Sequence, residues 1–316
     1  MAIDFSIISP IMNEEETVIP LCDKIVNVMK SELSNYSFEV ILIDDGSTDL
    51  SAQKINEANE KYEEVSGIFF RRNFGKSIAL NAGFQEAKGE YIITIDADLQ
   101  DEPNEIPKLF KKLEEGYDLV SGWKEKRQDS LEKRLPSKLF NYAASKITGV
   151  SLHDFNCGFK IYRSWCVKNI IITGNLYRYL PALVHEQGGK VTEVSVVHHK
   201  RSHGVSKYGV MRYFHGAIDL VTMVFLLKFF QKPLYFFSLL AGPLLVLGGA
   251  ILTYLLGGHL HYLITSDTSY QLVSRPLLQI AITLLGMGLL IGLNGLLAEF
   301  ILSVHNRKTM TYHKTK

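Results

Sequence analysis

Residues 40–49 read VILIDDGSTD, an apolar run that ends abruptly in acidic and small polar residues. Val40–Ile43 has the β-branched composition of a buried strand, and the polar residues after it are typical of a turn that leads into a helix. This arrangement recurs along the first two thirds of the chain. The predicted strands are Phe5–Ser9, Val40–Ile43, Ser66–Phe70, Tyr91–Ile95, Leu119–Ser121 and Val191–Val197.

Longer helical stretches follow these runs, so the sequence predicts an α/β fold with a mostly parallel sheet and helices on both of its faces. Such sheets bind their ligands at the carboxyl ends of the strands. Three of those ends are rich in acidic or amide side chains: PIMNEE at 10–15, DDGSTD at 44–49 and DADLQD at 96–101. Neither G-x-G-x-x-G nor G-x-x-x-x-G-K-[ST] occurs, which argues against a dinucleotide-dependent dehydrogenase and a P-loop protein.

Carboxylates that converge on one sheet edge repel one another unless a cation or a hydrogen-bonded ligand offsets them. Oxygen ligands select Mg²⁺ or Mn²⁺, and such an ion often completes its coordination with substrate phosphates. Asp96 and Asp98 stand two apart, so in an extended conformation both face the same side, with Gln100 next in that period. Taken alone, each acidic motif also fits a turn or a helix N-cap.

The charged residues are distributed unevenly. Of 34 basic and 33 acidic residues, only Asp267 and Arg275 fall within residues 233–298. The net charge of +1 gives no general attraction to nucleic acid. Three cysteines without a CxxC pair indicate free thiols in a reducing compartment, and the N-terminus does not read as a signal peptide. We therefore expect a catalytic domain in the cytoplasm.

Two uncharged runs, Leu234–Leu256 and Leu277–Ala298, are long enough to cross the hydrocarbon core as helices. Their glycines suit close helix contacts in lipid. Basic residues precede the first run and follow the second, which predicts that both ends of the chain face the cytoplasm of an inner-membrane protein.

Two further segments are amphipathic. Tyr208–Phe230 reads as a helix that lies in the membrane interface, whereas Leu131–Ile147 fits either an interfacial helix or an ordinary surface helix. The expected organisation is a catalytic domain at residues 1–205, interfacial helices at 206–232, a two-helix transmembrane domain at 233–306 and a basic cytoplasmic tail at 307–316.

The order of motifs adds a resemblance. PIMNEE at 10–15, IDDGSTD at 43–49, RRNFGK at 71–76, DADLQD at 96–101 and RSHGVSKYG at 201–209 together resemble family 2 glycosyltransferases of the polyprenyl-phosphate type. These include dolichyl-phosphate mannose synthases and bactoprenol glucosyltransferases, and the two spans resemble the bactoprenol branch. The resemblance implies a GT-A fold and transfer of one sugar, with inversion, onto a polyprenyl phosphate. The bactoprenol branch also implies a homo-oligomer packed through the glycine-bearing spans.

The resemblance also implies roles for particular residues. Asp96, Asp98 and Gln100 would hold Mg²⁺ or Mn²⁺. Asp98 and Asp154 are the candidate catalytic residues. Many relatives carry a Gly-Asp-Phe-Arg segment whose aspartate is a candidate base, but this chain has Gly158 at that position. Asp154 is the nearest substitute. The donor would meet Pro10, Asn13, Glu15, Asp44, Asp45, Arg72, Lys76 and Asp96. The acceptor phosphate would meet Lys124, Arg134, Ser137, Arg201, Ser206 and Lys207.

We expect the donor to be UDP-glucose. Alternatives are GDP-mannose and donors of other sugars such as GlcNAc or a modified arabinose. A processive polysaccharide synthase is disfavoured because the Q-x-x-R-W signature of that class is missing. A non-catalytic scaffold that binds nucleotide sugars at the membrane is the third reading, and the retained acidic motif argues against it.

Overall fold

The computed structural model describes residues 3–124, 145–146, 148–199, 221–222, 224–229, 232–265 and 276–309. It forms two compact units, Met1–Met223 and Val224–Lys316. The first unit contains a seven-stranded sheet with the strand order β3-β2-β1-β4-β6-β5-β7. Its strands are β1 Phe5–Ile11, β2 Phe38–Asp44, β3 Val65–Phe69, β4 Tyr91–Thr94, β5 Leu119–Trp123, β6 Lys160–Arg163 and β7 Val191–Ser195.

Helices connect most of these strands. The α-helices that the structure describes in the first unit are α1 Val18–Glu32, α2 Ser51–Lys61, α3 Lys76–Glu86, α4 Ile106–Glu114, α6 Trp165–Lys168 and α7 Leu180–Glu186. Two 3₁₀ turns, η1 Pro103–Glu105 and η2 Leu176–Tyr179, precede α4 and α7. Strand, helix and strand alternate from β1 to β5, which is the rhythm that the sequence predicts.

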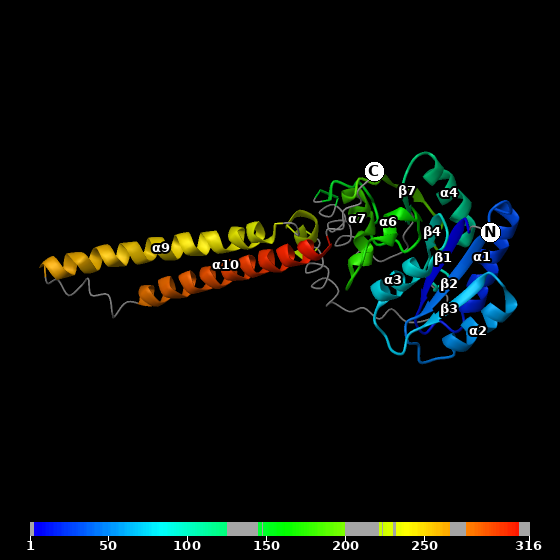
Figure 1. Cartoon of the computed structure of the whole chain (residues 1–316), viewed down its shortest axis with the longest axis horizontal. Coiled ribbons are helices and arrows are strands. Elements are labelled where there is room, and N and C mark those ends of the chain that lie inside the picture. Colours follow the sequence, from blue (N-terminus) through cyan, green and yellow to red (C-terminus); the bar gives the residue numbers. More distant parts are fainter. Residues whose placement is uncertain are drawn as a thin grey trace. The chain divides into compact units, whose positions relative to one another are not determined.

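Helices cover both faces of the sheet (Figure 1), and a hydrophobic layer lies between the sheet and the helices on each face. On one face α1, α2 and α4 pack against strand residues that include Phe5 and Ile7, and on the other face α3, α6 and α7 pack against Ile8 and Ile41. Successive residues of a strand point to opposite faces, so β1 and β2 are buried on both sides and read as nearly continuous apolar runs. The acidic side chains Asp45 and Asp96 lie just beyond the ends of β2 and β4.

The predicted α/β fold with a mostly parallel sheet is confirmed. β1 pairs in parallel with β2 and β4, β2 with β3, and β5 with β7. One strand was not predicted: β6 lies antiparallel between β4 and β5. Its four residues, KIYR, contain two cations and give no strong strand pattern, so pairing with distant segments decides their conformation.

All three cysteines are buried in the first unit as free thiols, as expected: Cys22, Cys157 and Cys166. Burial raises the pKa of each thiol to about 12. The reactive form of cysteine is the thiolate, so these side chains are chemically quiet at neutral pH. They serve as small apolar core residues.

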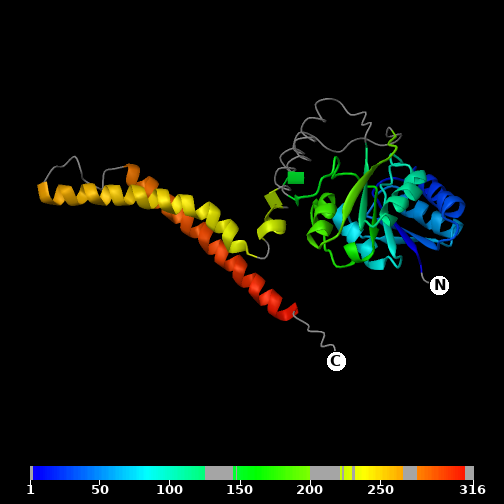
Figure 2. The same cartoon turned by 90° about the horizontal axis from the view of Figure 1, so that it is seen from above.

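The described part of the second unit consists of the short π-helix η3 Phe225–Phe229 and two long helices, α9 Pro233–Thr265 and α10 Pro276–Thr309. The long helices run antiparallel beside each other (Figure 2). Both are long and apolar enough to cross a membrane, as the sequence predicts. The backbone N–H of Leu234, at the start of α9, donates to the Glu299 carboxylate of α10 at 3.3 Å.

Only some of the glycines lie at the contact between α9 and α10. A Cβ built on Gly248 would lie 2.9 Å from Leu285 Cγ, and one built on Gly295 would lie 2.7 Å from Phe237 Cβ. A Cβ on Gly292 would meet no atom within 4 Å. Gly248 and Gly295 therefore set how closely the helices approach, as expected for small residues at helix contacts in lipid.

This difference predicts opposite effects for two similar substitutions. Gly295→Ala places a methyl group against Phe237 and should destabilise the helix pair by about 1–3 kcal/mol. Gly292→Ala, one turn away, gains helix propensity without a clash and should stabilise it by about 0.5–1 kcal/mol. Thermal unfolding of the full chain in detergent, followed by circular dichroism, measures both, and equal melting temperatures would contradict the packing argument.

Candidate functional site

Polar side chains join the loops that follow β1 and β2. Asn13, whose φ is 56°, accepts a hydrogen bond from the Thr48 backbone N–H through Oδ1 at 2.8 Å. Glu15 Oε2 accepts one from the Leu50 backbone N–H at 2.8 Å. Both predicted donor-binding residues thus organise the turn after β2. Their contact with a donor stays a prediction.

Two buried aspartates, Asp44 at the end of β2 and Asp45 just after it, accept hydrogen bonds from backbone amides. Asp44 Oδ1 accepts the Ser47 N–H at 2.9 Å. Asp45 accepts the Phe74 N–H through Oδ1 at 2.7 Å and the Gly75 N–H through Oδ2 at 2.9 Å. Asp45 therefore fastens the loop before α3 to the end of β2.

Gly46 makes this close approach possible. Its φ is +71°, and a Cβ there would lie only 2.3 Å from the carbonyl carbon of Arg72. The exposed Arg72 guanidinium lies 4.8 Å from the centre of the Phe74 ring, a cation–π distance. The loop thus presents Arg72 at the surface and directs the chain towards Lys76, the first residue of α3.

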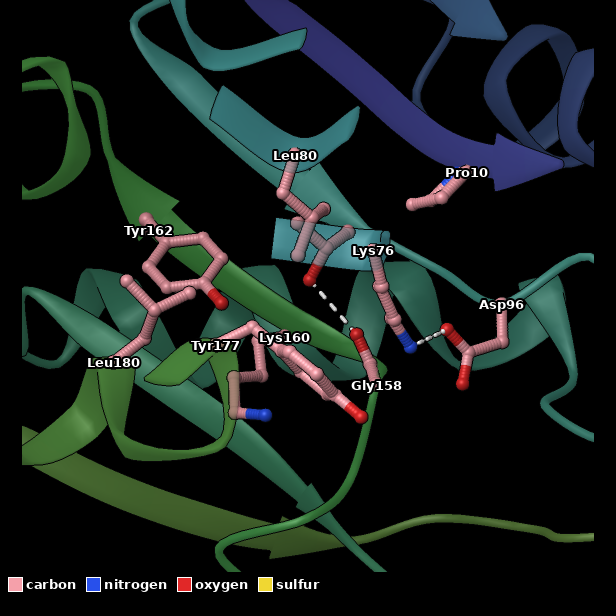
Figure 3. A pocket seen from close by; sticks show the side chains of 10 residues that line it. Pro10, Lys76, Leu80, Asp96, Gly158, Lys160, Tyr162, Tyr177 and Leu180 are labelled. Carbon is pink, nitrogen blue, oxygen red and sulfur yellow. Dashed lines mark hydrogen bonds and ion pairs between the residues drawn. The ribbon is translucent and has the colours of Figure 1, made fainter. Parts of the chain in front are cut away.

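Lys76 forms an ion pair with Asp96, the second residue after the end of β4 (Figure 3). Its ammonium also lies 5.0 Å from the centre of the Tyr177 ring. Burial acts to lower the pKa of Lys76, but the charge of Asp96 and the hydrogen bond to it outweigh that effect and raise it. The motifs at 71–76 and 96–101 are therefore joined directly, and the loop at 71–76 links Asp45 to Asp96.

This ion pair borders a small pocket between β4, β6, α3 and η2 (Figure 3). Its lining combines two lysines and one carboxylate with hydroxyl and apolar side chains: Pro10, Lys76, Leu80, Thr94, Asp96, Gly158, Lys160, Tyr162, Tyr177 and Leu180. Pro10, Lys76 and Asp96 were predicted to bind the donor. Lys160 was not assigned, because a lysine in an unrecognised strand is normally exposed.

Asp98 and Gln100 continue from Asp96, but not as an extended strand. Leu99 has a φ of 56°, and Asp98 Oδ1 accepts the Gln100 N–H at 3.2 Å, which makes a turn. The extended conformation that the sequence suggested is therefore wrong. Within the described residues, no three His, Cys, Asp or Glu side chains form a group able to hold a metal.

A divalent cation still fits the donor atoms of this turn. Asp96 and Asp98 are hard oxygen ligands carried by one loop, and a Mg²⁺ or Mn²⁺ site commonly uses one or two carboxylates plus substrate phosphates. Asp96 already lies against a cation, the Lys76 ammonium. The carboxylates thus suit a site that is completed by a bound substrate.

Asp101, at the end of the same motif, is a buried residue whose partners the sequence did not indicate. It pairs with Lys124 at 3.0 Å and with His198 Nδ1 at 3.3 Å. Burial acts to raise the pKa of Asp101, but His198 and Lys124 lower it overall. The same pairing outweighs burial and raises the pKa of Lys124. Two features of the sequence could have indicated this pair. Asp101 is the third aspartate after β4, and Lys124 directly follows β5.

Asp154, the candidate base, is buried, and its Oδ1 accepts the Asn156 backbone N–H at 3.0 Å. It is not among the described residues that line the pocket at Asp96. Gly158 does line it, and a Cβ on Gly158 would lie 2.5 Å from Asp96 Oδ2. An aspartate at position 158 would therefore collide with Asp96 and repel it.

Most of the predicted acceptor site cannot be compared with the geometry. Lys124 has a side chain that is only 11% exposed, and the Asp101 carboxylate is its ion-pair partner. Its role towards an acceptor stays a prediction. Five other predicted residues lie outside the described part of the chain: Arg134, Ser137, Arg201, Ser206 and Lys207.

Residues 6–170 match glycosyl transferase family 2. The chain belongs to this family. It is 36% identical to dodecaprenyl-phosphate galacturonate synthase of Rhizobium johnstonii over 97% of this chain and 90% of the relative. It is 34% identical to undecaprenyl-phosphate 4-deoxy-4-formamido-L-arabinose transferase of Pseudomonas aeruginosa over 90% of this chain and 83% of the relative. The resemblance to the polyprenyl-phosphate type of the family is confirmed.

Solved structures support the fold of this glycosyltransferase. Mannosyl-3-phosphoglycerate synthase from Rubrobacter xylanophilus has a TM-score of 0.54 at 15% identity, over 71% of this chain and 74% of its own. Glucosyl-3-phosphoglycerate synthase from Mycobacterium tuberculosis, in complex with Mn²⁺, UDP-glucose and glycerol 3-phosphate, has a TM-score of 0.53 at 18% identity, over 71% and 79%. At these identities the likeness is one of fold.

Substitution of Gly158 tests the packing beside Asp96. We expect Gly158→Ala to push Asp96 away from Lys76 and to lower the stability of the first unit by about 1–3 kcal/mol. Asn156→Ala, in the same loop, removes a side chain without approaching Asp96 and serves as the control. Thermal unfolding compares the two variants, and a Gly158→Ala variant as stable as the control would refute the steric argument.

Substitution of Asp101 tests its buried ion pairs. Because the pKa of Asp101 in the folded chain lies below its ordinary value of 3.8, its carboxylate stabilises the fold above that pH, and the contribution is lost as the pH falls through the folded pKa. Asp101→Asn should cost about 3–5 kcal/mol at pH 7, because Lys124 loses its partner.

The difference in stability between Asp101→Asn and the original chain should shrink as the pH falls below 3.8. Denaturant unfolding between pH 7 and pH 3 measures it, with the exposed Glu63→Gln as a control that changes little. A difference that stays constant with pH would show that the charge of Asp101 is not what stabilises this part of the fold.

Proposed function

We propose that this chain transfers a single sugar from a nucleotide to a polyprenyl phosphate, with inversion at the anomeric carbon. The observation that carries the proposal is the Lys76–Asp96 ion pair at the acidic carboxyl edge of the sheet, where the two motifs assigned to the donor meet. Supporting it, two relatives of nearly full-length similarity are named for sugar transfer to dodecaprenyl and undecaprenyl phosphate.

The donor diphosphate would bind at the turn after β4. Asp96, Asp98 and Gln100 would hold Mg²⁺ or Mn²⁺ there, and when bound this ion would act as a Lewis acid that stabilises charge on the diphosphate. The Lys76 ammonium, beside Asp96, is in position to donate to a phosphate oxygen. The loops fixed by Asn13, Glu15, Asp44 and Asp45 would receive the nucleoside.

In the reaction, a phosphate oxygen of the lipid attacks the anomeric carbon as the bond from that carbon to the nucleoside diphosphate breaks. The second pKa of a phosphate monoester is about 6, so this nucleophile is largely ionised at neutral pH and needs little help from a base. Two features are consistent with this small requirement for a base: position 158 is a glycine without a side chain, and Asp154 is buried. Positioning would account for most of the rate enhancement.

The sugar is the finer part of the proposal. The sequence led us to expect UDP-glucose, whereas the relatives are named for galacturonate and for 4-deoxy-4-formamido-L-arabinose. We therefore propose that the donor is a nucleotide-linked monosaccharide and that its sugar is glucose, galacturonate or 4-deoxy-4-formamido-L-arabinose. Pocket shape rather than the shared acidic motifs would distinguish among these sugars.

We further propose that α9 and α10 cross the inner membrane, that the catalytic unit and both chain ends are cytoplasmic, and that the protein is a homo-oligomer. A catalytic domain at residues 1–205 and interfacial helices at 206–232 complete this organisation. The acceptor phosphate would then meet Lys124 and the basic residues near the membrane, Arg134, Arg201 and Lys207, together with Ser137 and Ser206.

The decisive experiment incubates the purified full chain with polyprenyl phosphate, Mg²⁺ or Mn²⁺ and a panel of labelled donors. The panel holds UDP-glucose, UDP-galacturonate, the UDP-linked formamidoarabinose and GDP-mannose, and mass spectrometry identifies the lipid product. One donor should dominate. Donor binding without transfer from any donor would support the scaffold reading instead.

Asp98→Asn should lower the rate of product formation with every donor by about 100-fold or more, because an amide is a poor ligand for Mg²⁺ or Mn²⁺. Glu60→Gln removes an exposed carboxylate far from the sheet edge and should leave the rate unchanged. Initial rates of lipid glycosylation at saturating metal compare the two variants. Full activity of Asp98→Asn would remove Asp98 from the mechanism.

A further inference from the structure

Lys160 is a buried lysine that the proposed reaction does not yet use. It begins β6, it is only 3% exposed, and it lines the pocket that Lys76 and Asp96 border (Figure 3). Its ammonium donates a hydrogen bond to the carbonyl oxygen of Cys157. An ammonium has three N–H donors, so this bond engages one of them.

Burial of this ammonium is energetically unfavourable as the structure stands. Lysine is almost never fully buried unless it is paired, and among the described residues Lys160 forms no ion pair. Burial lowers its pKa, and the positive charge of Lys76 acts in the same direction, whereas the charges of Asp154 and Asp96 oppose this effect without cancelling it. The one carboxylate that lines the pocket, Asp96, is already paired with Lys76.

The charges of the pocket indicate what it binds. Two ammonium groups and one carboxylate line it, with Tyr162 and Tyr177 supplying rings and Leu80 and Leu180 supplying apolar surface. The net positive charge favours an anion, and a charge-assisted hydrogen bond from Lys160 to an anionic oxygen would offset the cost of its burial.

We propose that Lys160 is a further substrate-binding residue, whose ammonium holds an anionic oxygen of a substrate bound beside Asp96. This inference rests on the proposed function. The oxygen belongs either to a phosphate, of the donor or of the lipid, or to a carboxylate of the transferred sugar. Either a phosphate or a carboxylate would accept a hydrogen bond from the same ammonium, but removal of the ammonium would change different kinetic constants in the two cases.

The test compares Lys160→Met, which removes the charge, with Lys160→Arg, which keeps it, in the full chain. Lys190→Met is the control, because Lys190 is an exposed lysine just before β7. Three quantities are measured with Mn²⁺ present: the dissociation constant of UDP, the KM for polyprenyl phosphate, and the ratio of kcat/KM for UDP-galacturonate to that for UDP-galactose.

Lys160→Met should worsen one of these quantities by about tenfold or more, and Lys160→Arg should recover part of the loss. Weaker UDP binding assigns the ammonium to the donor diphosphate, a higher KM for the lipid assigns it to the acceptor phosphate, and a lost preference for UDP-galacturonate assigns it to a sugar carboxylate. All three quantities within twofold of those of Lys190→Met would overturn the proposal.

Stability separates binding from a structural role. Because Lys160 forms no ion pair among the described residues, Lys160→Met should melt at or above the temperature of the original chain. A lower melting temperature together with unchanged binding would assign Lys160 to the fold alone. If the original chain transfers no sugar, the proposed reaction fails, whereas the UDP titration still decides whether Lys160 binds a diphosphate.

Discussion

Negative charge gathered at one sheet edge is the constraint on which the rest of the catalytic unit depends. Three aspartates in the two loops after β2 and β4 each receive a different kind of partner: Asp45 takes two backbone amides, Asp96 an ammonium, and Asp101 an ammonium and an imidazole. Each partner belongs to a segment distant in sequence, so neutralising the aspartates also draws the loops together. The same contacts that relieve repulsion therefore build the proposed substrate site.

The sequence was sufficient to predict the features of the fold and of the site that depend on neighbouring residues. Apolar runs ending in acidic turns predicted the parallel strands and the sheet edge at which the acids meet, because strand burial and turn chemistry are written in neighbouring residues. The family motifs likewise brought Lys76 and Asp96 into one predicted donor site, and the ion pair between them is consistent with that assignment.

The parts that the sequence did not indicate are those decided by distant contacts. Strand β6 exists because β4 and β5 offer it hydrogen-bonding edges, and this insertion carries Lys160 into the interior. The turn at Leu99 replaces an extended chain because Asp98 bonds to the backbone two residues on. Residue spacing alone does not determine either outcome.

The burial of the three cysteines has a practical consequence for studying this enzyme in solution. Thiol-specific probes react with thiolates, and the native thiols are both shielded from solvent and held in the protonated form. A single cysteine introduced at an exposed position would therefore take a fluorophore or spin label selectively. Distance measurements between the two units can start from the wild-type background, without a cysteine-free variant.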